Sequence, residues 1–128
     1  MEFKLYRCAH CGNVALKVVD KGVPLVCCGE KMEEWVPNTT DAAQEKHVPV
    51  VERTPHGSGE TVTVKVGSVT HPMLSEHSIT MIAAVTGDTV TLRFPKPGDA
   101  PELRTFSKGG SVEAYEICNL HGFWKGEG

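Results

Sequence analysis

Two groups of residues in this chain have side chains that commonly bind metals. The first is Cys8-Ala9-His10-Cys11-Gly12, followed by the adjacent pair Cys27-Cys28. Two residues between Cys8 and Cys11 allow a tight turn that points both sulfurs at one ion, and Gly12 permits the backbone conformation that follows. Both zinc and a rubredoxin-like iron accept tetrahedral sulfur. The cysteines therefore predict a metal site and leave its metal open between zinc and iron.

Because Cys27 and Cys28 are adjacent, we expect an unusual backbone conformation at this pair. Neighbouring side chains of a strand point to opposite faces, so two consecutive sulfurs reach one ion only if the backbone is locally distorted. We expect such a distortion and a distorted tetrahedron of sulfurs. His10 lies inside the first turn, but the cysteines already fill the site, and we expect this histidine to face solvent.

The second group contains the fifth cysteine and four histidines. Cys118 and His121 are three residues apart, so that a turn can bring both to one metal. His71 precedes Pro72, which favours an extended backbone, and His77 follows shortly before an expected strand. His47 lies in the segment Glu45-Lys46-His47-Val48-Pro49. No helical periodicity links these residues, so their types and spacing alone do not show that they converge. His56 lies in a Gly-containing segment that we assign to a loop, outside the site.

The elements that would position these residues are predicted to be strands. Residues 61–66 alternate between apolar and polar side chains, as a half-buried strand does. Residues 79–85 and 89–94 flank a Thr-Gly-Asp turn and predict a hairpin. The prolines of residues 95–101 predict a loop. Further strands are expected at 103–106 and 112–118, and the whole pattern predicts an all-β fold with a sandwich or barrel.

The N-terminal part has a different character. Residues 3–8, 14–19 and 25–28 predict short strands with Gly-containing turns. A unit of this size buries too little apolar surface to be stable alone, so it needs a staple, which four cysteines can provide. The polar segment 37–44 predicts a linker. We therefore expect a metal domain at 1–36 and a second domain at 45–128.

Composition excludes several classes of protein. The 128 residues carry a formal net charge of -3 and show no basic stripe, which argues against nucleic-acid binding. No run approaches the roughly 20 apolar residues of a membrane span, and no apolar segment of a secretory signal is visible. We therefore expect a cytoplasmic protein. The five cysteines, an odd number, fit metal ligation better than disulfides in that compartment.

Taken together, these motifs resemble the desulfoferrodoxin family of two-iron superoxide reductases along essentially the whole chain. The CxxCG and CCGE spacings resemble the desulforedoxin-like domain of that family. Four further segments resemble the superoxide reductase domain of that family: EKHVP at 45–49, VGSVTHPM at 66–73, KPGDAP at 96–101 and CNLHGFW at 118–124. One departure is Ser78, where the family often has an aromatic residue after the histidine.

The resemblance implies the following site and partners. The first domain holds an iron on Cys8, Cys11, Cys27 and Cys28, and the second is an immunoglobulin-like β-sandwich with an iron on His47, His71, His77, Cys118 and His121. The histidines are equatorial ligands and the cysteine is axial, which leaves one of six octahedral positions open for a small anion. It also implies two irons per chain, a rubredoxin-like electron donor and a homodimer.

Two further residues are predicted to take part in catalysis. Superoxide is an anion and the chain is net negative, so a local cation must attract it, and Lys46 is the candidate. Its ammonium would also orient the water that supplies a proton. The resemblance implies that Glu45 occupies the open position once the iron is ferric.

Three alternative functions remain open at this point. The first is a non-enzymatic zinc-binding module, which leaves the second group of ligands unexplained. The second is a superoxide dismutase, which would produce oxygen as well as peroxide. The third is an electron-transfer protein, which predicts no open metal position and no effect of azide or cyanide.

Overall fold

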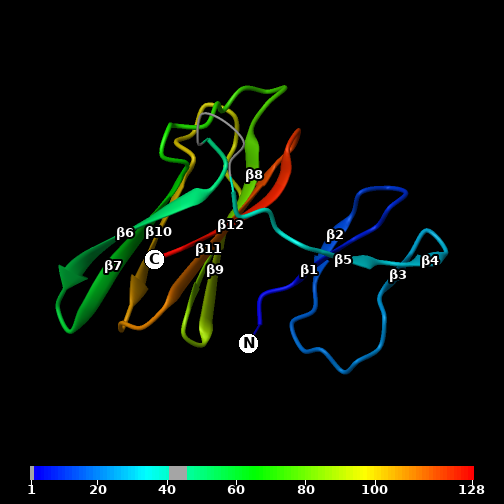
Figure 1. The fold of residues 1–128 in the computed structure, drawn as a ribbon, viewed down its shortest axis with the longest axis horizontal. Helices are drawn as coiled ribbons and strands as arrows, with labels where there is room; N and C mark the ends of the chain where they lie inside the picture. Colours follow the sequence, from blue (N-terminus) through cyan, green and yellow to red (C-terminus); the bar gives the residue numbers. More distant parts are fainter. Residues whose placement is uncertain (1, 41–45) are drawn as a thin grey trace. The chain divides into compact units, whose positions relative to one another are not determined.

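A computed structural model describes residues 2–40 and 46–128, and all strands lie within these ranges (Figure 1). The chain divides into two compact units, Met1–Val36 and Pro37–Gly128. No helix occurs among the described residues, and the expected all-β class is confirmed. The described part of the chain accordingly has no helix that could cross a membrane.

The first unit is built from very short strands. β1 (Leu5–Arg7) lies between β2 (Val14–Leu16) and β5 (Glu33–Trp35), and β3 (Val26–Cys27) pairs with β4 (Glu30–Lys31). β2 is shorter than the strand expected over 14–19. The buried apolar side chains among the described residues of this unit are those of Phe3, Leu5 and Cys8. So small a core is consistent with the expected need for a metal staple.

The second unit is a β-sandwich of two antiparallel sheets (Figure 1). One sheet has the order β10-β7-β6 and the other the order β12-β11-β8-β9. The strands are β6 (Pro49–His56), β7 (Gly59–Val66), β8 (Ile79–Thr86), β9 (Thr89–Arg93), β10 (Glu102–Ser107), β11 (Val112–Cys118) and β12 (Gly122–Glu127). A sandwich of three plus four strands agrees with the expected immunoglobulin-like architecture.

Two strands of this unit were not predicted from the sequence. β6 carries prolines at both Pro49 and Pro55, which a strand tolerates at the edge of a sheet, where β6 lies. β12 contains Gly122 and Gly126, which weaken the strand signal. His56 is the last residue of β6 and pairs with Gly59, so its assignment to a loop was wrong.

The core of the sandwich follows the expected alternation along the strands. Val62, Val64 and Val66 of β7 are all at most 1% exposed and face the second sheet. Their partners include Ile82 and Ala84 of β8. The remaining members of this cluster are Ile79, Leu103, Val112, Ala114 and Cys118. One residue of the second metal group, Cys118, is therefore part of the hydrophobic core.

A glycine allows the two sheets to approach closely beside the N-terminal end of β6. A Cβ atom on Gly126 of β12 would collide with the backbone carbonyl oxygen of Pro49. Any larger residue at 126 would therefore displace Pro49, which is only two residues from His47. The close approach fixes the start of the strand that follows this histidine.

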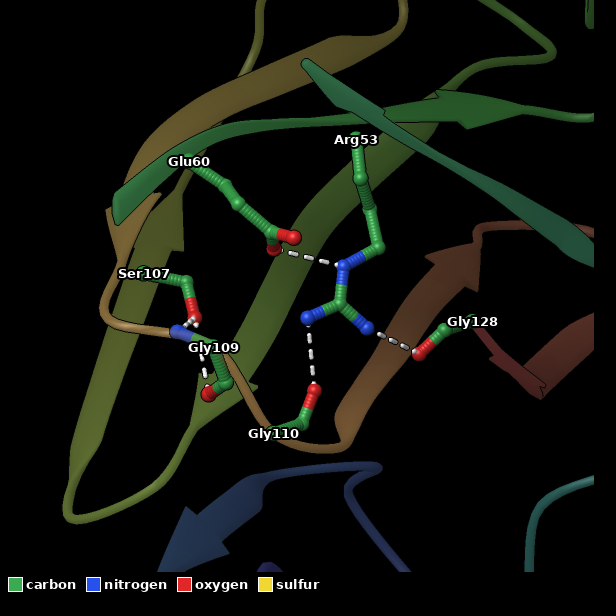
Figure 2. A network of polar contacts seen from close by, with 6 residues as sticks. All are labelled: Arg53, Glu60, Ser107, Gly109, Gly110 and Gly128. Carbon is green, nitrogen blue, oxygen red and sulfur yellow. Dashed lines mark hydrogen bonds and ion pairs between the residues drawn. The ribbon is translucent and has the colours of Figure 1, made fainter. Parts of the chain in front are cut away.

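Arg53 joins three segments of the sandwich through one guanidinium group (Figure 2). Its Nε donates to the Glu60 carboxylate at 2.7 Å. One terminal nitrogen donates to the Gly110 carbonyl oxygen at 2.6 Å and the other to that of Gly128 at 3.1 Å. The planar fork of arginine suits this arrangement, because its donors point in fixed directions.

Replacing Arg53 by methionine is expected to lower the free energy of unfolding by about 1–3 kcal/mol, because charged donors are lost from a carboxylate and two carbonyls. Arg53→Lys should recover only part of this, since an ammonium lacks the fork. Urea denaturation followed by circular dichroism measures the effect. Arg104→Met, at an exposed position of β10, is the control. Equal destabilisation by Arg53→Met and Arg104→Met would contradict a stabilising role for the hydrogen bonds of Arg53.

Candidate metal centres

The antiparallel registers bring the second group of ligands to one end of the sandwich. Cys118 ends β11 and pairs with Ile79, the first residue of β8, and with Gly122, the first residue of β12. His77 and His121 flank these strand starts in the sequence. In the other sheet, Pro49 pairs with Val66, so that His47 precedes one strand and His71 follows the other at the same end.

Five potential ligand atoms meet at this end. One atom from each of His47, His71, His77, Cys118 and His121 lies within 4.8 Å of all the others. The imidazole rings form a closed cycle in the order 47, 71, 77, 121, with centroid separations of 4.6–5.1 Å and interplanar angles of 67–81°. Cys118 is 1% exposed and His121 is exposed, so the group extends from the core to the surface. The structure thus brings together all five residues that the resemblance implied.

The nitrogen atoms of this group are arranged as a metal requires. Nε2 of His71 and Nε2 of His77 are buried and make no hydrogen bond. A buried polar atom without a partner is costly, and a bound cation would supply one to each of these. His71 Nδ1 lies 2.7 Å from the Pro72 carbonyl oxygen, which holds the proton on Nδ1 and leaves Nε2 as the donor to a metal. These residues therefore fit an iron with nitrogen and sulfur ligands.

The other two imidazoles point their nitrogens at the same place. His47 Nε2 lies 3.1 Å from His121 Nδ1, and the sulfur of Cys118 lies 3.7 Å from that same Nδ1. Two ring nitrogens and a sulfur this close together are typical of atoms that share one ion. His121 would accordingly bind through Nδ1, and the other histidines through Nε2.

Burial changes the acid–base properties of two of the ligands. It lowers the pKa of His71 to about 4, although the hydrogen bond to the Pro72 carbonyl opposes the shift. His71 is therefore neutral at pH 7, as a metal ligand must be. Burial also raises the pKa of the Cys118 thiol, with backbone N–H groups of Leu120 and His121 acting in the opposite direction. A bound cation would favour the thiolate, and those N–H groups are in place to stabilise it.

Trp124 supports two of the histidines, a role that its place in the CNLHGFW motif did not reveal. Its indole stacks on the His47 ring, with centroids 4.8 Å apart and an angle of 19°. Its Nε1 donates to the backbone carbonyl of His121 at 3.1 Å. An aromatic residue three positions after a histidine was the only sequence signal, and it does not specify a partner in a distant segment.

The first unit holds the cluster of four cysteines. One sulfur from each of Cys8, Cys11, Cys27 and Cys28 lies within 4.8 Å of the others. The expected distortion is present, because Cys28 has a positive φ of 53° and is followed by Gly29 at 76°. Two successive residues with left-handed φ break the alternation of a strand, so the sulfurs of Cys27 and Cys28 need not point to opposite faces.

Hydrogen bonds support the sulfurs of this cluster. The Cys11 N–H points at the sulfur of Cys8 at 3.5 Å, and with other contacts it lowers the pKa of that thiol to about 6. Asn13, which sequence reasoning did not select, donates from its side chain to the sulfur of Cys27 at 3.7 Å. His10 is exposed, as expected, and lies 3.1 Å from a carboxylate oxygen of Glu30, outside the cluster.

Comparison with known proteins agrees with this geometry. Residues 39–127 match the family model described as Desulfoferrodoxin, and residues 1–34 match the one described as Desulfoferrodoxin, N-terminal domain. The chain belongs to the desulfoferrodoxin family. The desulfoferrodoxin of Nitratidesulfovibrio vulgaris is 46% identical over 98% of this chain and 97% of that protein.

Several solved structures that resemble this chain are named superoxide reductases. The superoxide reductase from Treponema pallidum superposes with a TM-score of 0.73 at 34% identity and covers 98% of each chain. That from Nanoarchaeum equitans has a TM-score of 0.58 at 26% identity and covers 73% of this chain and 98% of its own. Family membership and the two clusters are together consistent with two irons per chain, one on sulfur alone and one on histidine and cysteine.

Of the two residues predicted to act in catalysis, only Lys46 lies among the residues that the structure describes. Lys46 is partly exposed and directly precedes His47 of the histidine cluster. Glu45 lies outside the described residues.

Proposed function

We propose that this protein is a superoxide reductase, which converts superoxide and two protons to hydrogen peroxide with one electron from iron. The observation that carries the proposal is the convergence of four imidazoles and one thiol on a single point, with two buried nitrogens lacking any partner. Related proteins of this architecture are named superoxide reductases. When bound at this point, iron supplies the electron.

The residues of the cluster would divide the work as follows. Cys118 and the imidazoles of His47, His71, His77 and His121 hold the ion, with the sulfur on the core side. His121 is the exposed member of the group, so a small anion reaches the cluster from its solvent side. Five protein ligands would surround the ion, so the site would suit one small substrate, in contrast to oxygenase sites, which hold fewer protein ligands and bind two substrates.

Lys46 is proposed to attract superoxide and to orient the water that provides a proton. Its ammonium is the charge next to His47 in a chain whose formal net charge is -3. Glu45 is proposed to bind the ferric ion through its carboxylate after turnover, because a hard anionic oxygen favours the harder ion. The role of Lys46 follows from its charge and its position next to His47 in the sequence, and that of Glu45 from the family resemblance.

Electron supply, assembly and location complete the proposal. Each turnover consumes one electron, and a small carrier of the rubredoxin type would replace it. Residues 1–36 form the four-cysteine iron domain, 37–44 connect it, and 45–128 form the reductase domain. The protein is proposed to work as a homodimer in the cytoplasm, where it removes superoxide under oxidative stress.

The ratio of products tests the reaction. After subtraction of the uncatalysed disproportionation of superoxide, measured without protein, reduced protein without an electron donor should form one peroxide per oxidised iron, release no oxygen and then stop. Oxygen electrodes and a peroxide assay measure both products. Continued consumption of superoxide with release of oxygen, faster than the uncatalysed reaction, would identify a dismutase, and consumption no faster than the uncatalysed reaction would favour a zinc-binding module.

Lys46→Ala is expected to slow the second-order reaction with superoxide by about 10-fold and to weaken its dependence on ionic strength, since local charge steers an anionic substrate. Stopped-flow or pulse-radiolysis kinetics at several salt concentrations measure this. Lys46→Arg should retain most of the rate. Lys108→Ala, at an exposed position beyond the far end of β10, is the control. An unchanged rate in Lys46→Ala would refute the role.

A further inference from the structure

Asn119 connects the turn that carries two ligands to the segment that carries a third. Its side-chain oxygen accepts a hydrogen bond from the backbone N–H of Ser78 at 3.0 Å. Its side-chain nitrogen donates to the backbone carbonyl of Glu76 at 3.1 Å. Its own backbone N–H donates to the carbonyl of Ser78 at 3.1 Å. One asparagine thus bonds to the residues on both sides of His77.

The segment around His77 needs such support. It is a tight turn closed by bonds between the backbones of Leu74 and His77, at 2.9 and 3.2 Å. Residues 74–76 are exposed, so little packing fixes the turn from outside. The amide of Asn119 has one acceptor and two donor hydrogens, and its oxygen and nitrogen face a donor and an acceptor respectively. The side chain therefore matches the peptide groups of that turn.

The same contacts explain why the chain can have a serine at position 78, where the family often has an aromatic residue. Both bonds from Asn119 to Ser78 use backbone atoms of Ser78. The identity of the side chain at 78 does not enter them. His77 therefore keeps its place relative to Cys118 although this chain lacks the aromatic residue that the family often has after the histidine.

We propose that Asn119 is a positioning residue that holds His77 at the metal against Cys118 and His121. It is not a member of the ligand group, and it acts by fixing the backbone on either side of His77. The proposal rests on the proposed function only through the assignment of His77 as an iron ligand. Loss of a residue that orients a metal ligand typically weakens metal binding by about 10–100-fold.

A double-mutant cycle with His77 tests this. Full-length protein loaded with iron-57 is incubated without oxygen with a graded ferrous-iron chelator. Mössbauer spectra then count the iron left at each site, and the four-cysteine iron serves as the internal reference. Asn119→Ala should lower the chelator concentration that removes half of the histidine-site iron by about 10-fold. The His77→Ala background is loaded with excess ferrous iron and titrated over a lower range of chelator concentrations, because its site is weaker. There the same change should have no further effect, because the residue that it positions is gone.

Two further variants keep the test decisive. Asn119→Asp retains the acceptor for Ser78 but places an oxygen against the Glu76 carbonyl, so it should lose iron as Asn119→Ala does even if the alanine variant folds poorly. Asn38→Ala, at an exposed asparagine whose backbone pairs with Phe123 and Lys125, should change nothing.

The possible results distinguish the positioning role of Asn119 from the role of His77 as an iron ligand. Unchanged iron retention in Asn119→Ala and Asn119→Asp, or equal losses with and without His77, would overturn the positioning role. Unchanged retention in His77→Ala would instead remove His77 from the ligand set and with it part of the proposed function.

Discussion

His71→Ala is expected to remove iron from the histidine site and to lower the rate of superoxide reduction by at least about 100-fold, the upper end of what loss of a supporting residue causes. His71 is 2% exposed, and its Nε2 has no partner other than the ion that we propose. The iron-57 Mössbauer spectrum and stopped-flow kinetics measure the two effects. Since alanine also leaves a cavity, unfolding should occur at a lower temperature.

The control for this variant is another histidine of the same domain. His56 ends β6, is exposed and lies outside the ligand cluster, so His56→Ala should keep both irons and the full rate. His71→Gln offers a second comparison, because it fills most of the space without an imidazole. If His71→Gln kept the iron and the rate, the assignment of His71 as a ligand would be wrong.

Cys11→Ser is expected to unfold residues 1–36 while leaving the sandwich folded and reactive. The first unit buries few apolar side chains among its described residues, so metal binding has to supply much of its folding free energy. Cys11 is exposed, so its replacement by serine removes a ligand without disturbing the packing. Hydrogen–deuterium exchange by mass spectrometry should show loss of protection in residues 1–36 and unchanged protection in the second unit.

Kinetics of the same variant separate the two roles open to the four-cysteine iron. If that iron is only a staple, a single turnover of the reduced protein and the steady-state rate with a rubredoxin-type donor should both persist. If it relays electrons, the single turnover should persist and the steady-state rate should fall. His10→Ala, in the same turn but outside the cluster, should change neither. Retained protection of residues 1–36 in Cys11→Ser would contradict the metal-dependent fold.

The sequence by itself determined the elements whose signals are local. Alternation along Thr61–Val66 and the Thr-Gly-Asp turn after Val85 specify β7, β8 and β9, because side chains of a strand alternate between its two faces. Cys8 and Cys11 are spaced for one ion by the geometry of a tight turn. β6 and β12 were not predicted, because prolines and glycines in them weaken the local signal and only pairing with neighbours makes them strands.

The tertiary structure alone shows how the histidines come together, a grouping that only the family resemblance had implied. His47 and His121 are 74 residues apart in the sequence, yet their ring nitrogens lie 3.1 Å from each other. No local pattern specifies such a distance. It results from antiparallel registers in two sheets, which place the end of β11 beside the start of β8, and the start of β6 beside the end of β7.

The roles of the residues that support the ligands are also visible only in the tertiary structure. Asn119 and Trp124 stand in the sequence as parts of one short motif, and their types suggest no particular partner. Only the packed sandwich shows that the asparagine bonds on both sides of His77 and that the indole stacks on His47. Hydrogen bonds and ring contacts between distant segments depend on three-dimensional proximity, which residue order along the chain does not encode locally.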